Sequence, residues 1–140
     1  MKVTLERKND DYLFEAKGKS GVPLHIDNTV DGVSNGSSPM ELLLMGVGGC
    51  SAIDVIHILK KQRQKITSYT IEISGEREKI KEANPFKSMH VHINLEGEIL
   101  PQKAIKAAQL SFEKYCSVSI TLEKSVIINY SITLNSVKIV

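Results

Sequence analysis

The 140-residue sequence contains no tryptophan, only two cysteines and only 5% aromatic residues. With so few aromatic side chains it lacks the stacking surfaces that bind single-stranded nucleic acids. Its 18 basic and 16 acidic residues give a net charge of +2, which is too small to predict a polyanionic partner. We therefore expect neither nucleic acid nor an anionic membrane as the main partner.

Long apolar runs and targeting signals are missing as well. No run approaches the roughly 18 residues of a membrane span, and the first eight residues lack the apolar stretch of a signal peptide. The content of 41% hydrophobic and 24% charged residues is that of a globular chain, here a single domain over 1–140. We expect a cytoplasmic protein in which Cys50 and Cys116 are reduced thiols, because cellular reductants keep them so.

Hydrophobic patterning predicts a mixture of strands and helices. Apolar and polar residues alternate over 3–5, 12–16, 22–26, 69–73, 89–95 and 125–134, which is typical of strands. A long helix is expected from Pro39 to about Lys65, and a second one from Pro101. Polar and glycine-rich residues over 27–38 and charged residues over 76–87 predict loops.

The long helix carries clear end signals. Ser38 is a good cap, Pro39 suits the first helical position, and Glu41 lies where the helix dipole favours a negative charge. Between 42 and 59 the helix is apolar on most sides, so it must be covered on most sides. One small sheet covers one face only, and we expect a partner subunit to cover another.

Three glycines, Gly46, Gly48 and Gly49, precede Cys50 inside this helix. Each costs roughly 1 kcal/mol relative to alanine, so a close approach of another segment or of a ligand is expected there. We interpret the cluster as a close helix–helix crossing with an open slot beside the thiol. The alternative is that Cys50 is an inert core residue, as most buried cysteines are.

Asp54 and His57 follow Cys50 at i+4 and i+7, on roughly the same helical stripe. The stripe is either catalytic or a polar strip at a subunit interface. Cys116, at the end of the second helix, could form a redox pair with Cys50 only if the fold brings their Cα atoms within about 6 Å. Around Cys50, apolar walls are expected from Leu43, Val47, Ile53 and Phe112.

His90 and His92 lie two residues apart on one face of a predicted strand. Such a pair could contribute to a metal site, but that face is the expected solvent side and the thiols lie elsewhere. We therefore expect no metal ion and no other cofactor.

Residues 38–50, Ser-Pro-Met-Glu-Leu-Leu-Leu-Met-Gly-Val-Gly-Gly-Cys, and 114–119, Lys-Tyr-Cys-Ser-Val-Ser, resemble two motifs of the OsmC/Ohr superfamily. The expected order of elements is also similar over nearly the whole chain. The resemblance implies an α+β fold, with antiparallel sheets around a long central helix. It also implies an intertwined homodimer with its active sites at the subunit interface.

The same resemblance implies a thiol-dependent reduction of organic hydroperoxides. The peroxidatic cysteine of the family corresponds to Cys50 and its resolving cysteine to Cys116. Cys50 would become a sulfenic acid and then form a disulfide with Cys116. A dithiol or a lipoylated protein would be the reductant.

Active members also have a glutamate ten positions before the first cysteine, paired with an arginine. Met40 occupies that position here, and Glu41 follows one residue later. Glu41 is therefore the candidate for this role, and the alternative is that it is only a first-turn residue of the helix. Arg7 is the only arginine in the N-terminal strands, and no arginine is assigned to the site. The incomplete pair motivates an alternative function, a non-catalytic ligand-binding or redox-sensing dimer.

Overall fold

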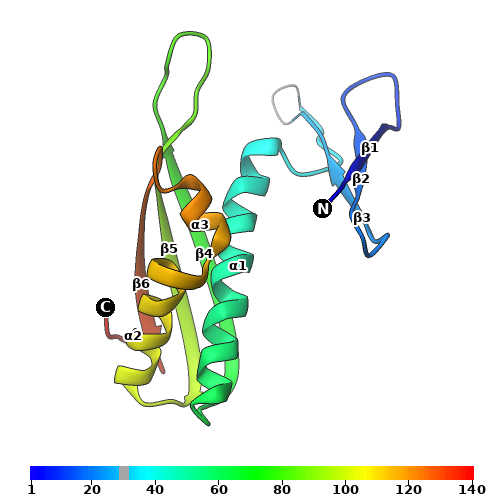
Figure 1. The fold of residues 1–140 in the computed structure, drawn as a ribbon. Helices are drawn as coiled ribbons and strands as arrows, with labels where there is room; N and C mark the ends of the chain where they lie inside the picture. The colour runs from blue at the N-terminus through cyan, green and yellow to red at the C-terminus, as the bar shows by residue number, and fades with distance from the viewer. Residues whose placement is uncertain (29–31) are drawn as a thin grey trace. The chain divides into compact units, whose positions relative to one another are not determined.

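The computed structural model describes residues 1–28 and 32–140 of the chain. These residues form two compact units, 1–43 and 44–140, and each is described by itself (Figure 1). Residues 29–31, which belong to the predicted loop over 27–38, lie outside the described residues.

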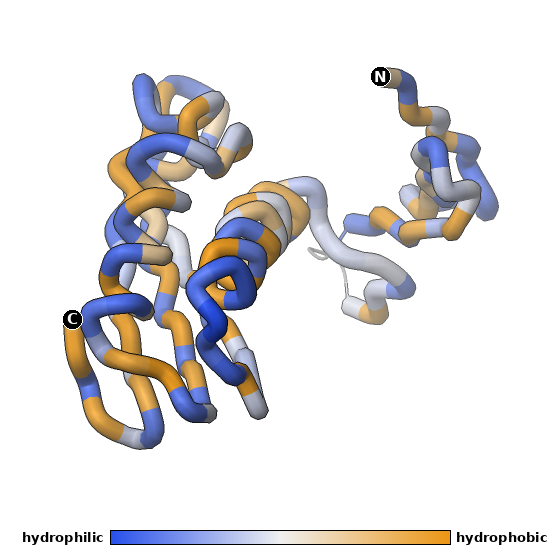
Figure 2. The backbone as a smooth tube through the Cα atoms, turned by 60° about the horizontal axis from the view of Figure 1, so that its bottom comes forward, coloured by the Kyte–Doolittle hydropathy of each residue, from blue (hydrophilic) through white to orange (hydrophobic). Residues whose placement is uncertain are grey.

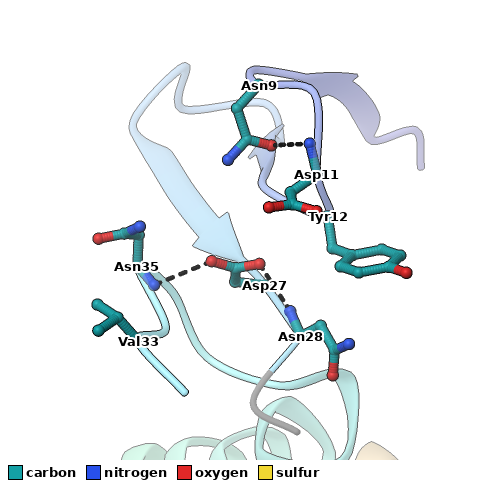
Figure 3. Close-up of a pocket in the computed structure, with 7 residues that line it drawn as sticks. All are labelled: Asn9, Asp11, Tyr12, Asp27, Asn28, Val33 and Asn35. Atoms are coloured by element: carbon teal, nitrogen blue, oxygen red, sulfur yellow. Dashed lines mark hydrogen bonds between the residues drawn. The ribbon is translucent and has the colours of Figure 1, made fainter. Parts of the chain in front are cut away.

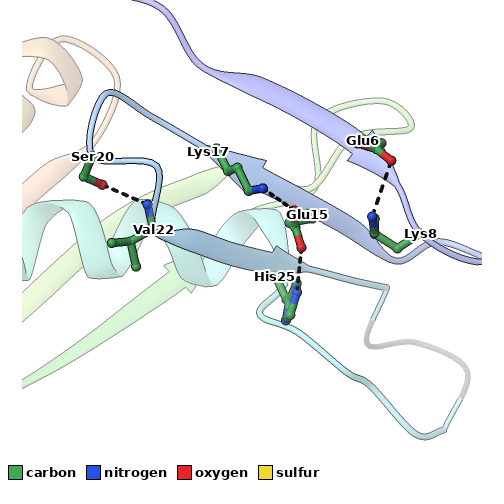
Figure 4. Close-up of polar contacts among 7 residues, drawn as sticks. All are labelled: Glu6, Lys8, Glu15, Lys17, Ser20, Val22 and His25. Carbon is green, nitrogen blue, oxygen red and sulfur yellow. Dashed lines mark hydrogen bonds and ion pairs between the residues drawn. The ribbon is translucent and has the colours of Figure 1, made fainter.

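The first unit contains a three-stranded antiparallel sheet in the order β1-β2-β3. Its strands are β1 (Thr4–Arg7), β2 (Phe14–Lys17) and β3 (Pro23–Ile26), which confirms the strands predicted from alternation. On β2, the Glu15 carboxylate pairs with Lys17 at 3.0 Å and with His25 Nε2 at 3.7 Å (Figure 4). The hydrogen bond from Lys17 is the main reason that the pKa of Glu15 is lowered. Apolar side chains of this unit are nevertheless exposed, namely those of Val3, Leu5, Val22 and Leu24.

The loops around this sheet are held by side-chain oxygens. The buried carboxylate of Asp27 accepts hydrogen bonds from the backbone amides of Asn28 and Asn35, at 2.7 and 2.9 Å (Figure 3). The side-chain oxygen of Asn9 accepts the amide of Asp11 at 3.0 Å. Between these loops lies a polar hollow of about 120 Å³. These contacts hold described residues of the loops together within the first unit.

Helix α1 spans Pro39–Lys61. The Ser38 hydroxyl accepts the amide of Glu41 at 3.2 Å, and the Glu41 carboxylate accepts the amide of Ser38 at 2.7 Å, so the two residues form a capping box. The hydrogen bond from the backbone amide of Ser38 is the main cause of the lowered pKa of Glu41. The hydrogen bond with the Ser38 side chain lowers this pKa further. The predicted start of α1 is confirmed. Its end comes four residues earlier than predicted, because Arg63 has φ 58° and β4 begins at Lys65.

The second unit is built on a sheet in the order β4-β5-β6-β7. Strands β4 (Lys65–Arg77) and β5 (Phe86–Glu98) form an antiparallel hairpin. Strands β6 (Ile127–Leu134) and β7 (Val137–Lys138) follow, and β5 and β6 run parallel, which differs from the expected antiparallel sheets.

A parallel pair needs a crossover connection. It consists of helix α2 (Pro101–Leu110), the π-helical turn η1 (Ser111–Tyr115) and helix α3 (Ser117–Leu122). The crossover and α1 lie side by side along the sheet (Figure 1).

The core of this unit lies between the sheet and the helices. Hydrophobic and hydrophilic residues alternate along the strands (Figure 2). Strand β5 buries its hydrophobic residues Met89, Val91, Ile93 and Leu95. Helix α1 adds Val47, Val55 and Leu59, which are also buried. Alternate residues of β5 point to the opposite face of the sheet, where His90 Nε2 and His92 Nδ1 both share a hydrogen bond with the Ser131 hydroxyl, at 2.8 and 2.7 Å.

Within this unit, the glycine of α1 that is needed for close packing is Gly48, and the neighbour that it allows to approach is a strand. A Cβ on Gly48 would collide with the side chain of Ile73 in β4. Gly46 faces Val118 of α3, where a Cβ would lie at an ordinary contact distance of 3.7 Å. The expectation of a helix–helix crossing is therefore corrected at Gly48: this glycine allows α1 to pack closely on the sheet.

By length and composition, α1 could cross a membrane. The expectation that no apolar segment approaches the length of a membrane span was therefore wrong. One such helix is weak support for a membrane protein, since core helices pass the same test. One face of α1 packs into the core through Val47, Val55 and Leu59.

The packing of Gly48 predicts a contrast between two matched substitutions. We expect Gly48→Ala to lower the free energy of unfolding by about 1 kcal/mol, because the cost of overpacking exceeds the gain in helix propensity. Gly46→Ala should instead raise it by about 0.5–1 kcal/mol, since the added methyl group has room. Urea denaturation of both variants checks this, and equal effects would contradict the packing assigned to Gly48.

Candidate functional site

Cys50, Asp54 and Cys116 meet in the second unit. The two sulfur atoms and a carboxylate oxygen of Asp54 all lie within 4.8 Å of one another. Cys50 and Asp54 are one helical turn apart on α1, so their side chains share a face. Cys116 comes from the junction of η1 and α3. Both cysteines are free thiols, Cys50 half-buried and Cys116 buried.

Ser111 joins the two segments that carry the site. Its buried hydroxyl donates a hydrogen bond to Asp54 Oδ2 at 3.1 Å, and its carbonyl accepts the amide of Cys116 at 2.7 Å. The second bond spans five residues, which is the spacing of a π-helix. The stacking of Phe112 on Tyr130 of β6, with ring centroids 4.8 Å apart, fixes the same turn to the sheet. The π-helical turn therefore sets where Cys116 lies relative to α1.

Two opposing effects act on the Cys116 thiol. Burial raises its pKa, and the neighbouring Cys50 adds to the increase. The hydroxyl and the amide of Ser119 both donate to Cys116 Sγ, at 3.0 and 3.4 Å, and lower the pKa. The pKa is raised overall, so Cys116 is a neutral thiol at neutral pH whose sulfur already has two donors directed at it.

A surface groove of about 420 Å³ extends from Asp54 along α1. Its apolar walls come from Ile58, Leu110 and Tyr115, and its polar groups beyond Asp54 are His57, Lys61 and Gln62. Asp54 belongs both to this groove and to the thiol cluster, whereas neither Cys50 nor Cys116 lines the groove. None of the expected wall residues Leu43, Val47, Ile53 and Phe112 lines it.

Comparison with known proteins identifies the family. The model of the OsmC-like protein family matches residues 32–131. The chain belongs to this family. Protein YhfA of Escherichia coli K12 is 44% identical over 97 residues, which cover 67% of this chain and 70% of YhfA.

Solved structures of other proteins have the same fold. A hypothetical protein from Aquifex aeolicus VF5 is 30% identical, with a TM-score of 0.80 over 96% of each chain. An organic hydroperoxide resistance protein OsmC from Legionella pneumophila is 15% identical, with a TM-score of 0.70 over 95% of this chain and 97% of that one. The α+β fold with a long helix, expected from the sequence motifs, is confirmed.

The structure brings together only part of the predicted site. Cys50, Cys116 and the stripe residue Asp54 form one cluster, whereas His57 lies in the groove. Glu41 belongs to the first unit, where its carboxylate binds the amide of Ser38.

Arg7 and the pair His90 and His92, which were also considered from the sequence, form hydrogen bonds within their own units. Arg7 donates to the backbone carbonyls of Asp10 and Asp11. Among the described residues, neither His90 nor His92 joins a group that could hold a metal.

Sequence reasoning missed Ser111 and Ser119. Ser119 had a local signal, since it stands three residues after Cys116, the spacing at which a cap residue meets an amide. Ser111 had none, because its bond to Asp54 joins segments 57 residues apart.

The hydrogen bonds to Cys116 predict a pH effect. In a Cys50→Ser background, Ser119→Ala should raise the pKa of Cys116 further, because one donor to the thiolate is lost. The ultraviolet absorbance of the thiolate during a pH titration measures this. Ser117→Ala, at an exposed serine of the same helix, is the control and should leave the titration unchanged. An unchanged titration in Ser119→Ala would contradict the assigned bonds.

Proposed function

We propose that this protein reduces organic hydroperoxides with Cys50 and Cys116 as its redox pair. The observation that carries the proposal is the approach of the two sulfur atoms to within 4.8 Å, although they are far apart in the sequence. A disulfide needs about 2 Å between them, so the sulfur atoms must move closer by at most about 2.8 Å. The half-buried Cys50 is the thiol that an oxidant reaches first.

The reaction has two steps at the protein. The sulfur of Cys50 attacks the terminal oxygen of the hydroperoxide, the O–O bond breaks, and the alcohol leaves with the thiol proton. Cys50 is now a sulfenic acid. The sulfur of Cys116 then attacks the sulfur of Cys50, the S–S bond forms, and the hydroxyl group leaves as water with the proton of Cys116. A dithiol or a lipoylated protein restores both thiols by exchange.

The groove beside Asp54 supports an organic substrate. Ile58, Leu110 and Tyr115 offer apolar contact to a carbon skeleton, which hydrogen peroxide does not have. The Legionella pneumophila relative of the same fold is named as an organic hydroperoxide resistance protein and a predicted redox protein. Both observations favour an alkyl or aryl hydroperoxide over hydrogen peroxide.

We further propose a homodimer that functions in the cytoplasm. In the second unit, α1 leaves Met45 and Ile53 exposed by 50% and 70%, and a Cβ on Gly49 would meet nothing within 4 Å. A second copy is the partner that this apolar strip fits best, since large exposed apolar patches mark interaction sites. The expected role of Glu41 toward the thiol is part of the same proposal.

The oligomeric state is tested by light scattering. We expect a mass of twice the 15.5 kDa of one chain. Ile53→Asp should shift the population to the monomer, because it places a charge in the apolar strip. Glu72→Asp, an exposed conservative change on β4, is the control and should leave the dimer intact. A wild-type monomer would refute the dimer.

The reaction is tested with purified protein, cumene hydroperoxide and a dithiol reductant. Wild type should consume the peroxide repeatedly, and Cys50→Ser should abolish this activity because the attacking sulfur is lost. Cys116→Ser should accumulate a sulfenic acid at Cys50, which dimedone traps and mass spectrometry detects. The matched control, His90→Ala, changes an exposed residue of β5 and should leave the rate unchanged.

Other outcomes of this assay refute defined parts of the proposal. If peroxide forms the Cys50–Cys116 disulfide once without turnover, the protein is a redox sensor and not a peroxidase. If both thiols persist after peroxide treatment, they have no redox function. Glu41→Gln tests the role of the carboxylate: a rate equal to wild type would limit Glu41 to its capping bonds with Ser38.

A further inference from the structure

We propose that the reduced protein binds a zinc ion through Cys50 Sγ, the Asp54 carboxylate and Cys116 Sγ. These three ligand atoms are close enough together to hold one metal ion, since all lie within 4.8 Å of one another. Zinc binding is a property separate from the redox reaction, because the redox reaction needs only the two thiols. It also differs from the histidine-based site considered from the sequence, because it uses neither His90 nor His92.

The donor set fits zinc. Zinc accepts thiolate sulfur at about 2.3 Å and carboxylate oxygen at about 2.0–2.2 Å. Ligands at these distances around a tetrahedral ion lie roughly 3.5 Å apart, so the present group closes around the ion by a contraction of about 1 Å. Hard cations such as magnesium prefer oxygen alone, and two sulfur atoms therefore exclude them. Three protein ligands leave a fourth position, as in zinc sites that bind water or a substrate.

Two of the three ligands are already oriented by hydrogen bonds. The Ser111 hydroxyl holds Asp54 Oδ2 at 3.1 Å, and the Ser119 hydroxyl and amide both donate to Cys116 Sγ. Such outer bonds fix the ligands of metal sites and stabilise the anionic form that binds the metal. The three ligands come from two segments, α1 and the crossover, which Ser111 joins. The site is thus supported on both sides before an ion arrives.

Zinc would also control the redox reaction, a consequence that depends on the proposed function. Metal binding displaces the protons of both thiols. A hydroperoxide must then oxidise two zinc-bound thiolates. The two thiolates, one hydroperoxide and two protons react to give one disulfide, one alcohol and one water, and the zinc ion is released. Two electrons pass from the sulfur atoms to the O–O bond. Zinc should therefore slow the oxidation of the thiols, and oxidation should release zinc.

The experiment titrates the reduced full-length protein with Co²⁺, a coloured substitute for zinc, in a thiol-free reductant. We expect about one ion per chain, the charge-transfer absorption of thiolate–cobalt bonds and the intense visible bands of a tetrahedral ion. Competition with zinc then gives its affinity. Cys50→Ser and Cys116→Ser should each lose about half of the charge-transfer absorption, since each removes one of two sulfur ligands.

The remaining variants separate ligation from folding. Asp54→Asn should keep the charge-transfer absorption and weaken binding about tenfold or more, and Ser111→Ala should weaken it about tenfold. The His90→Ala/His92→Ala double variant is the matched control and should bind as wild type. Absence of the charge-transfer absorption, full affinity in Asp54→Asn, or loss of binding in the histidine variant would each overturn the site.

Turnover of cumene hydroperoxide is measured in parallel in the presence of a chelator. Turnover without cobalt binding refutes the metal site alone. Cobalt binding without turnover refutes the proposed peroxidase and leaves the metal site standing. The two proposals therefore fail separately.

Discussion

The contact between Ser111 and Asp54 is the constraint on which the arrangement of the site depends. Ser111 uses its hydroxyl to hold the carboxylate on α1 and its carbonyl to hold the amide of Cys116. One residue thus connects the helix that carries the first thiol to the segment that carries the second. Because the serine is fully buried, water does not compete for these bonds.

The two thiols have unequal surroundings. Cys50 is half-buried on a helix beside small residues, whereas Cys116 is buried and receives two hydrogen bonds from Ser119. Under the proposed peroxidase function, this inequality favours Cys50 over Cys116 as the thiol that an oxidant reaches first. The packing of the crossover on α1, which buries Cys116, also places the Asp54 carboxylate within 4.8 Å of both sulfur atoms.

The sequence allowed prediction of those features that depend on local interactions. The cap that Ser38 forms at the start of α1 is local, and so is the alternation that indicated the strands. The spacing of Cys50 and Asp54 placed them on one face of α1. The partnership with Cys116 came only from resemblance to a family. The parallel pairing of β5 and β6, the π-helical turn and the bond from Ser111 to Asp54 depend on contacts between distant segments, for which one sequence has no periodic signal.

The parallel pairing of β5 and β6 has a consequence for the order of folding. The hairpin of β4 and β5 closes over a short connection, but β6 reaches its position only after the whole crossover has been laid along α1. Loop closure over that distance is slow compared with hairpin formation. The two segments that carry the sulfur atoms, α1 and the crossover, therefore come together through contacts between distant parts of the chain and not through a local hairpin.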